Sequence, residues 1–191
     1  MPDLPEVLAF WFGSPDSPEL GRPRKCWFEK SAAFDAEVRA RFLGLYERAA
    51  AGDLGLWQCT PLSALALAVV LDQFPRNMFR GEARAFAADT LALRVGRGIV
   101  ELGFDAVLRP VERWFAYLPF EHAEDLAVQR RSLALFGALA QDRESAGTAD
   151  YALRHHDIIA RFGRFPHRNA ILGRESTPEE VEFLGQPGSS F

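Results

Sequence analysis

Apolar residues recur along most of the chain at the three- and four-residue spacing of an amphipathic helix. Between residues 32 and 51, for example, Phe34, Val38, Phe42 and Leu45 fall on one helical face. No segment shows the sustained strict alternation, with β-branched enrichment, that is typical of a strand. The pattern therefore predicts an all-α fold.

Residues that favour helix ends delimit the predicted helices. Asp3, Ser31 and Thr60 each stand at the N-cap position of an apolar periodic run. Thr177 and Glu180 have the spacing of a capping box. The predicted helices cover residues 4–12, 32–51, 61–73, 90–102, 110–117, 148–162 and 178–184, with a further long helix after residue 119.

Two prolines and one aspartate set the remaining boundaries. Pro75 disfavours helical geometry at the residue before it, so the apolar helix from residue 61 is predicted to end near Gln73. Pro119 is predicted to separate a short helix, which ends at Tyr117, from the longer helix that follows. Asp89 is predicted to be the N-cap of the helix over residues 90–102.

The length of the chain suits one hydrophobic core. A chain of 191 residues is long enough for one substantial core and short for two, so residues 1–191 are predicted to form a single domain. Its content of 48% hydrophobic and 12% aromatic residues is sufficient for that core without disulfides or metal ions. Consecutive helices with short links predict antiparallel helical hairpins.

Charge and apolar runs exclude several classes of protein. The formal net charge of −4 argues against general nucleic-acid binding, which needs a basic surface. The longest apolar run covers ten residues, about half of a membrane span, and the first residues lack the basic start of a signal peptide. Cys26 and Cys59 are isolated and are interpreted as reduced packing residues. We therefore expect a cytoplasmic protein that binds neither nucleic acid nor membrane.

Two segments that are far apart in the chain are near-copies of each other. LDQFPRNMFRG (71–81) and GRFPHRNAILGR (163–174) share Phe-Pro, Arg-Asn and a pair of Gly and Arg. Guanidinium and amide donors at such turns suit carboxylate or phosphate oxygens, although they could also bond the exposed carbonyls of helix ends. Since 20 Arg against 2 Lys is typical of a GC-rich genome, only the placement of particular arginines is informative. The candidate ligand-binding residues are Arg76, Asn77, Arg164, Arg168 and Asn169.

Candidate proton-transfer groups lie in and near these segments. Asp72 ends an aliphatic run next to Arg76, and is interpreted either as part of a structural ion pair or as a site carboxylate. In YLPFEHAED, His122 has Glu121 and two further acids within three residues, so its protonated form is expected to be favoured. His167 lies inside the second near-copy.

Other kinds of catalytic site receive less support. Glu124 and Asp125 are predicted to cap a helix start, and neither HExxH nor ExxH occurs, so no metal site is predicted. Neither cysteine lies in a basic motif and no GxSxG is present, so nucleophilic catalysis is not indicated. Of His155 and His156, one is expected to face inward and the other outward, near a helix C-terminus that favours positive charge.

The long motifs resemble one bacterial family. LDQFPRNMFRG, YLPFEHAED and IIARFGRFPHRNAILGREST, followed by EEVEFL, are similar to the family catalogued as domain of unknown function 924, nearly end to end. The resemblance implies a fold similar to the tetratricopeptide-like superhelix, and it implies no established activity, substrate or cofactor. A serine commonly follows the His of PFEH in this family, whereas Ala123 stands here, so serine chemistry is not expected at that position. The residues at signature positions are Asp72, Arg76, Asn77, Glu121, His122, Arg164, His167, Arg168 and Asn169.

Three interpretations of these residues stay open. The first is a polar, arginine-rich cleft between the two near-copied segments and the helix start at PFEH, which binds a small carboxylated or phosphorylated metabolite. Turnover by Asp72, Glu121, His122 or His167 is undecided, and no cofactor is expected. The second is a helical scaffold that binds a peptide or protein. In the third, the polar residues form a buried network that only fixes the helix ends.

Overall fold

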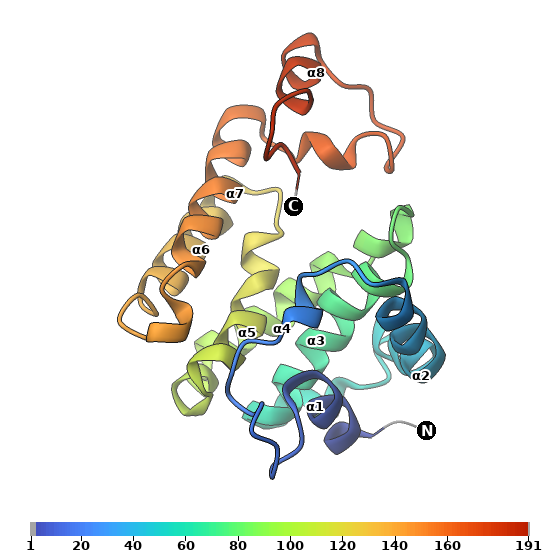
Figure 1. The fold of residues 1–191 in the computed structure, drawn as a ribbon, viewed down its shortest axis with the longest axis vertical. Coiled ribbons are helices and arrows are strands. Elements are labelled where there is room, and N and C mark those ends of the chain that lie inside the picture. The colour runs from blue at the N-terminus through green and yellow to red at the C-terminus, as the bar shows by residue number, and fades with distance from the viewer. Residues whose placement is uncertain (1–2, 191) are drawn as a thin grey trace.

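The computed structural model describes residues 3–190, and within them it contains eight α-helices and no strand. The helices are α1 (Leu4–Phe12), α2 (Ala32–Ala51), α3 (Pro61–Met78), α4 (Asp89–Glu101), α5 (Pro110–Glu121), α6 (Leu126–Gly137), α7 (Thr148–Phe162) and α8 (Pro178–Leu184). Figure 1 shows α1 to α5 in the lower part of the view, the α6–α7 pair at its left edge and α8 at the top. The prediction of an all-α fold is confirmed.

The predicted N-caps are confirmed where a side chain accepts from the first turn. The Asp3 carboxylate accepts from the backbone N–H of Glu6, and the Ser31 hydroxyl accepts from that of Phe34. At α8, Thr177 and Glu180 form the predicted capping box, because each side chain accepts from the backbone N–H of the other. These local signals place helix starts correctly because the orphan N–H groups of a first turn need acceptors wherever the helix packs.

Both predictions that rested on proline are wrong. α3 continues through Pro75 to Met78, and α5 continues through Pro119 to Glu121. An internal proline costs about 3 kcal/mol because it removes one N–H and crowds the preceding turn. The extra turn of α3 buries Phe74 and Met78, and that of α5 buries Leu118 and Phe120. Each of these side chains contributes roughly 1.5–3 kcal/mol, so two of them together exceed the cost of the proline. Burial therefore outweighs the local preference.

α3 is the central helix of the body. Fifteen of its eighteen residues are buried, and α1, α2, α4 and α5 all pack against it. A helix that is apolar on all sides is stable in water only when neighbours cover every face. Trp11 of α1 joins it to α5, since its ring meets those of Phe74 and Phe115 edge-on, with centroids 5.6 and 5.5 Å apart.

The approach of α4 to α5 depends on one glycine. A Cβ at Gly96 would lie 3.0 Å from the carbonyl oxygen of Ala116 and 3.1 Å from the ring of Phe120. A side chain at this position would require the neighbouring atoms of α5 to move by a few tenths of an ångström. This contact places the start of α4 near the end of α5.

A second, smaller core lies toward the C-terminus. Ile158, Ile159 and Phe165 form a buried cluster of their own, with Phe162 and Phe183 packed against it. It joins the end of α7 to α8 and to the segment between them. The α6–α7 pair connects this cluster to the main core.

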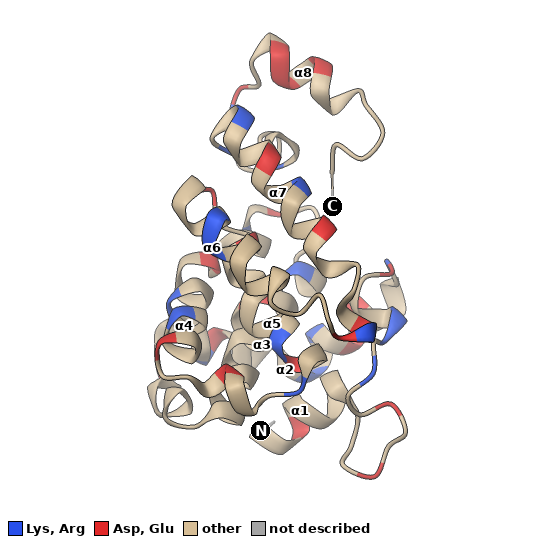
Figure 2. Ribbon diagram, turned by 90° about the vertical axis from the view of Figure 1, so that its left-hand side faces the viewer, with Lys and Arg blue, Asp and Glu red and all other residues tan. Residues whose placement is uncertain are grey.

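The surface carries mixed charges. Basic and acidic residues are interspersed over the face in Figure 2 instead of forming one basic region. None of the helices over residues 3–190 is both long and apolar enough to cross a membrane. Both cysteines are free thiols; Cys26 is partly buried but Cys59 is exposed, so the packing role predicted for Cys59 is wrong.

Candidate functional site

The two near-copied segments meet on the carboxylate of Asp89. Arg76, in the last turn of α3, donates from Nη1 and Nη2 to the two Asp89 oxygens at 3.0 and 3.1 Å. Arg168, in the 3₁₀ helix η6 (Pro166–Arg168), donates from Nη1 to Asp89 Oδ2 at 3.2 Å. The side chains of Arg76 and Arg168 are 20% and 7% exposed. The meeting point is therefore largely closed by the protein's own charges.

Asp89 does not have its predicted role. α4 begins at Asp89 itself, Ala88 is its N-cap residue, and no side chain caps this helix. The carboxylate instead bonds the two guanidiniums, while the positive end of the α4 dipole also favours a negative charge here. The interaction with two cations outweighs a single capping bond.

Aromatic rings orient the two guanidiniums. The Cζ atom of Arg168 lies 4.6 Å from the ring centroid of Phe86 and 4.6 Å from that of Phe165. Phe86, at the end of the 3₁₀ helix η3 (Ala83–Phe86), also contacts Arg76, whose Cζ is 5.7 Å from its centroid. Contacts between a cation and ring faces restrict the guanidinium plane and stabilise the buried charge.

Asp72 and His122 form a buried hydrogen-bonded pair beside Arg76. Asp72 is 1% exposed, and its Oδ1 is 2.8 Å from His122 Nδ1 and 3.4 Å from Arg76 Nη1. Gln73 Nε2 donates to Oδ2 at 2.6 Å. Burial alone would raise the pKa of Asp72, but Arg76 and the hydrogen bonds from His122 and Gln73 hold it below its ordinary value. The carboxylate is therefore charged, and His122 Nδ1 donates to it.

These contacts close into a ring of seven side chains, which we call the contact ring. Its members are Asp72, Arg76, Asp89, Arg168, Phe165, His155 and His122. The ring centroid of His155 lies 5.5 Å from that of Phe165 and 6.2 Å from that of His122, which completes the circuit. The contact ring joins α3, α4, α5, α7 and the η6 region, and it places acids, bases and cations next to one another.

Glu121 contacts His155 of the contact ring and is a protonated acid. Burial, followed by repulsion from Asp72, raises the pKa of Glu121 to about 8. His155 Nδ1 lies 2.8 Å from the backbone oxygen of Tyr151 and 3.1 Å from Glu121 Oε1, so Nδ1 carries a proton and donates toward both oxygens. Burial, followed by repulsion from His122, lowers the pKa of His155 to about 3. At neutral pH this contact therefore joins two mostly neutral groups.

The predictions for histidine charge are wrong. The pKa of His122 is lowered, because burial and Arg76 outweigh the attraction of Asp72. His155 is the buried member of its pair and is neutral, so the effect of burial exceeds that of the nearby helix C-terminus. His156 is the more exposed member and lies 3.0 Å from Asp157. His167, in η6, has its pKa lowered to about 4 by burial and then by Arg168.

The first near-copy also binds α2. Asn77 Nδ2 donates to Asp35 Oδ1 at 2.7 Å, and Arg80 donates to both oxygens of the same carboxylate at 2.8 and 2.9 Å. Asp35 lies in the first turn of α2. Asn77 is thus engaged in holding the end of α3 against α2, and it lies outside the contact ring.

The second near-copy is tied to α8 and to the PFEH segment. Asn169 donates to Glu180 at 3.2 Å, and Arg164 donates to both oxygens of Glu180 at 2.7 and 2.8 Å. Arg174 donates to both oxygens of Glu124 at 2.6 and 2.9 Å. The prediction that Glu124 caps a helix is therefore wrong, whereas Asp125 does accept from the first turn of α6.

Sequence reasoning missed Asp89, Phe86 and Phe165 as members of this site. Asp89 precedes an apolar periodic run, so a helix-capping role accounted for its presence in the sequence and no role in a site was sought. The only available signal was indirect: two arginines at apolar helix ends need a counter-charge. Within residues 3–190, no group of three or more His, Cys, Asp and Glu side chains could hold a metal ion.

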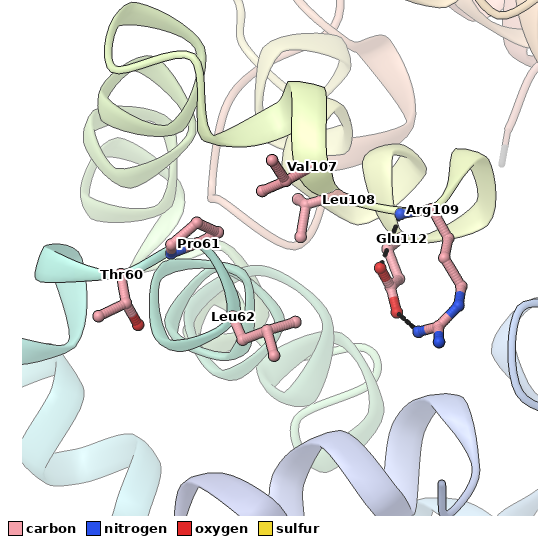
Figure 3. A pocket seen from close by; sticks show the side chains of 7 residues that line it. All are labelled: Thr60, Pro61, Leu62, Val107, Leu108, Arg109 and Glu112. Atoms are coloured by element: carbon pink, nitrogen blue, oxygen red, sulfur yellow. Dashed lines mark hydrogen bonds and ion pairs between the residues drawn. The ribbon is translucent and has the colours of Figure 1, made fainter.

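A separate open hollow of about 530 Å³ lies at the other end of α3. Thr60, Pro61, Leu62, Val107, Leu108, Arg109 and Glu112 line it (Figure 3). Its one carboxylate, on Glu112, is engaged by the side chain and the backbone N–H of Arg109, both at 2.8 Å. From Pro61 to Asp72 the axis of α3 rises roughly 17 Å, so this hollow is distinct from the contact ring and offers no unengaged acid or base.

Replacing Asp89 should destabilise the fold. We expect Asp89→Asn to lower the free energy of unfolding by about 2 kcal/mol, because two largely buried guanidiniums then lack a counter-charge. Glu47→Gln is the matched control, since the Arg84–Glu47 pair is 44% and 54% exposed and its loss should change stability by less than about 0.5 kcal/mol. Urea denaturation measures both. Equal effects of the two substitutions would contradict the central role of Asp89.

The raised pKa of Glu121 predicts a loss of stability with rising pH. Its folded pKa is about 8 against an ordinary value of 4.5, so between these values the folded state holds the extra proton. This stabilisation is complete below pH 4.5 and is lost as the pH rises through 8. The lowered pKa values of His122, His155 and His167 act in the opposite direction around pH 6.5, the ordinary histidine value. The contribution of Glu121 between pH 6.5 and 8 is therefore measured as the difference between the native chain and a variant that lacks this carboxyl group.

Between pH 6.5 and 8 we expect the free energy of unfolding of the native chain to fall by about 1–2 kcal/mol relative to that of Glu121→Gln. The variant lacks this contribution because its amide cannot titrate, whereas the histidines contribute equally in both proteins. Chemical denaturation at pH 6.5, 7.2 and 8.0 provides the measurement. A slope that is unchanged in the variant would show that Glu121 is not the titrating group.

The comparisons with known proteins cover nearly the whole chain. The family model described as a bacterial protein of unknown function (DUF924) matches residues 7–188. Among solved structures, the chain is similar to the protein of unknown function ATU0120 from Agrobacterium tumefaciens, with 41% identity and a TM-score of 0.82. That similarity covers 95% of this chain and 96% of the other. No curated protein matches the chain. The resemblance of the motifs is thereby confirmed, and the chain belongs to the DUF924 family of bacterial proteins of unknown function.

Proposed function

We propose that the chain binds a small anionic organic molecule at the contact ring and that His122 acts on it as a general base. The observation that carries this proposal is the geometry of His122. Its Nδ1 is held by the buried Asp72 carboxylate at 2.8 Å, while its Nε2 makes no hydrogen bond to any residue in 3–190. The side chain is 13% exposed, so the imidazole is held in place but still reaches the solvent.

An imidazole held in this way suits proton abstraction. The hydrogen bond to Asp72 fixes the tautomer with the proton on Nδ1, which leaves a lone pair on Nε2, and the carboxylate stabilises the imidazolium that forms. Because burial and Arg76 lower the pKa of His122, the imidazole is neutral at neutral pH and ready to accept a proton. Glu121, His155 and His167 are further proton-transfer candidates within or next to the contact ring.

The cations of the contact ring favour an anionic ligand. Arg76 lies next to the His122–Asp72 pair, but both of its terminal nitrogens bond Asp89, so it contributes its charge and not a direct contact. Arg168, on the other side of Asp89, can bind a carboxylate or phosphate through directed N–H groups. In this proposal the ligand is a carboxylated or phosphorylated metabolite of the cytoplasm. Asn77, Arg164 and Asn169 act indirectly, because protein carboxylates already accept from them.

His122→Gln tests this proposal. Wild-type protein is screened by thermal shift against small organic acids and sugar phosphates, and the compounds that raise Tm are incubated with it and followed by NMR. We expect at least one compound to bind and to be converted, and His122→Gln to slow conversion by about 100-fold or more, as loss of a general base does.

His156→Gln is the control, because His156 lies on the same helix as His155 but contacts Asp157 outside the contact ring. It should convert the compound at the wild-type rate. If no compound shifts the wild-type Tm, or if His122→Gln converts as fast as wild type, the proposal is wrong. Binding that depends on Arg168 without any conversion would support a binding protein and remove the catalytic step.

A second candidate function is a helical scaffold for a peptide or protein, as the tetratricopeptide-like resemblance suggests. α2 packs on α3 and α6 packs on α7, which is compatible with successive hairpins. The specific observation in its favour is the open hollow at the start of α3, where Leu62 and Val107 are 47% and 74% exposed.

The double substitution Leu62→Ser and Val107→Ser should then abolish co-purification of a stoichiometric partner. If the wild-type chain co-purifies with no such partner, the scaffold function is contradicted.

A further inference from the structure

The guanidinium of Arg168 has one edge that the protein does not use. Its Nη1 donates to Asp89, whereas the buried Nε has no protein acceptor and Nη2 makes no hydrogen bond to any residue in 3–190. The pair of Nε and Nη2 is one of the two forked edges by which arginine binds a carboxylate with parallel hydrogen bonds. A buried N–H without an acceptor costs about 1–3 kcal/mol, so this edge favours a partner that supplies acceptor oxygens.

The other candidate arginines differ from Arg168 in this respect. Arg76 uses both terminal nitrogens on Asp89, and Arg164 and Arg174 each bond both oxygens of a glutamate. A ligand at any of these three would have to displace a protein carboxylate. At Arg168 a ligand would add hydrogen bonds without breaking one, and Phe86 and Phe165 already hold the guanidinium in place.

We propose that the Nε–Nη2 edge of Arg168 is a subsite for a planar, singly charged carboxylate group of the ligand. This inference rests on the proposed function, and it names the chemical class of the ligand. A carboxylate presents two coplanar oxygens that match the fork. A doubly charged phosphate matches the fork less well electrostatically, because Asp89 and Glu124 lie nearby and would repel the second charge.

The charge balance of the contact ring agrees with a single negative charge. Asp72 and Asp89 oppose Arg76 and Arg168, so the four groups are neutral together. Burial, and then the neighbouring Arg76, lower the pKa of Arg168 to about 10, so the guanidinium stays charged at neutral pH. A monoanion on its open edge would be attracted to this charge.

The test is an NMR titration of the arginine Nε–H signals in the full chain. Acetate should move the Arg168 Nε–H resonance in a saturable way, whereas acetamide, which is isosteric but neutral, and chloride at equal ionic strength should not. Inorganic phosphate at pH 8 should bind about tenfold more weakly than acetate. Equal shifts with acetate and acetamide, equal shifts with acetate and chloride, or no shift with acetate would overturn the subsite. Binding of phosphate as tight as that of acetate would overturn its carboxylate class.

Arg168→Lys keeps the charge but lacks the fork, so it should weaken acetate binding by about tenfold or more. The matched control is Arg161→Lys, because Arg161 also contacts two phenylalanine rings and bonds a glutamate, but at the surface. It should bind acetate as wild type does. If Arg168→Lys does not fold, the wild-type Nε–H signal can still be assigned through its proximity to the ring protons of Phe86 and Phe165.

The outcome is separable from that of the proposed function. His122→Gln should leave the acetate-induced shift at Arg168 intact, since His122 does not contact that guanidinium. Acetate binding at Arg168 without any His122-dependent conversion would retain the subsite and remove the catalytic proposal. Conversion that depends on His122 while acetate leaves Arg168 unperturbed would do the reverse.

Discussion

The arrangement of the two near-copied segments depends on the carboxylate of Asp89. This carboxylate bonds Arg76 from the same body of helices and Arg168 from a segment 79 positions later in the chain. Two guanidiniums with like charge would repel each other in a largely buried place, and one carboxylate converts that repulsion into a three-group contact. The end of α3, the start of α4 and the region around η6 are therefore positioned by the same charge.

The helices could be predicted where local chemistry decides their ends. The N-caps at Asp3 and Ser31 and the capping box at Thr177 depend on residues three positions apart, so they are visible in the sequence. The extents of α3 and α5 could not be predicted in this way. Pro75 and Pro119 oppose helix locally, but the turns that they begin are buried against distant aromatic side chains, and tertiary burial is the larger effect.

The candidate site was predictable in its parts but not in its connections. The proximity of Asp72 and Arg76 follows from their spacing of four on one helix, and the similarity of the two Arg-Asn segments suggested that they belong together. The partner that joins them, Asp89, already had a sufficient local explanation as a cap. The charge states of His122 and His155 also depend on burial. Acidic residues next to a histidine in the sequence do not reveal how deeply that histidine is buried.

The small core formed by Ile158, Ile159 and Phe165 has a consequence for dynamics. It is separate from the main core and much smaller, so the end of α7 and the segment after it should open at a lower free energy than the body of the molecule. When this region opens, Arg168 leaves Asp89 and Phe165 leaves His155. A ligand of Arg168 would bind only the closed arrangement and would therefore slow amide hydrogen exchange in this region. Ligand affinity and local order would then be one coupled equilibrium.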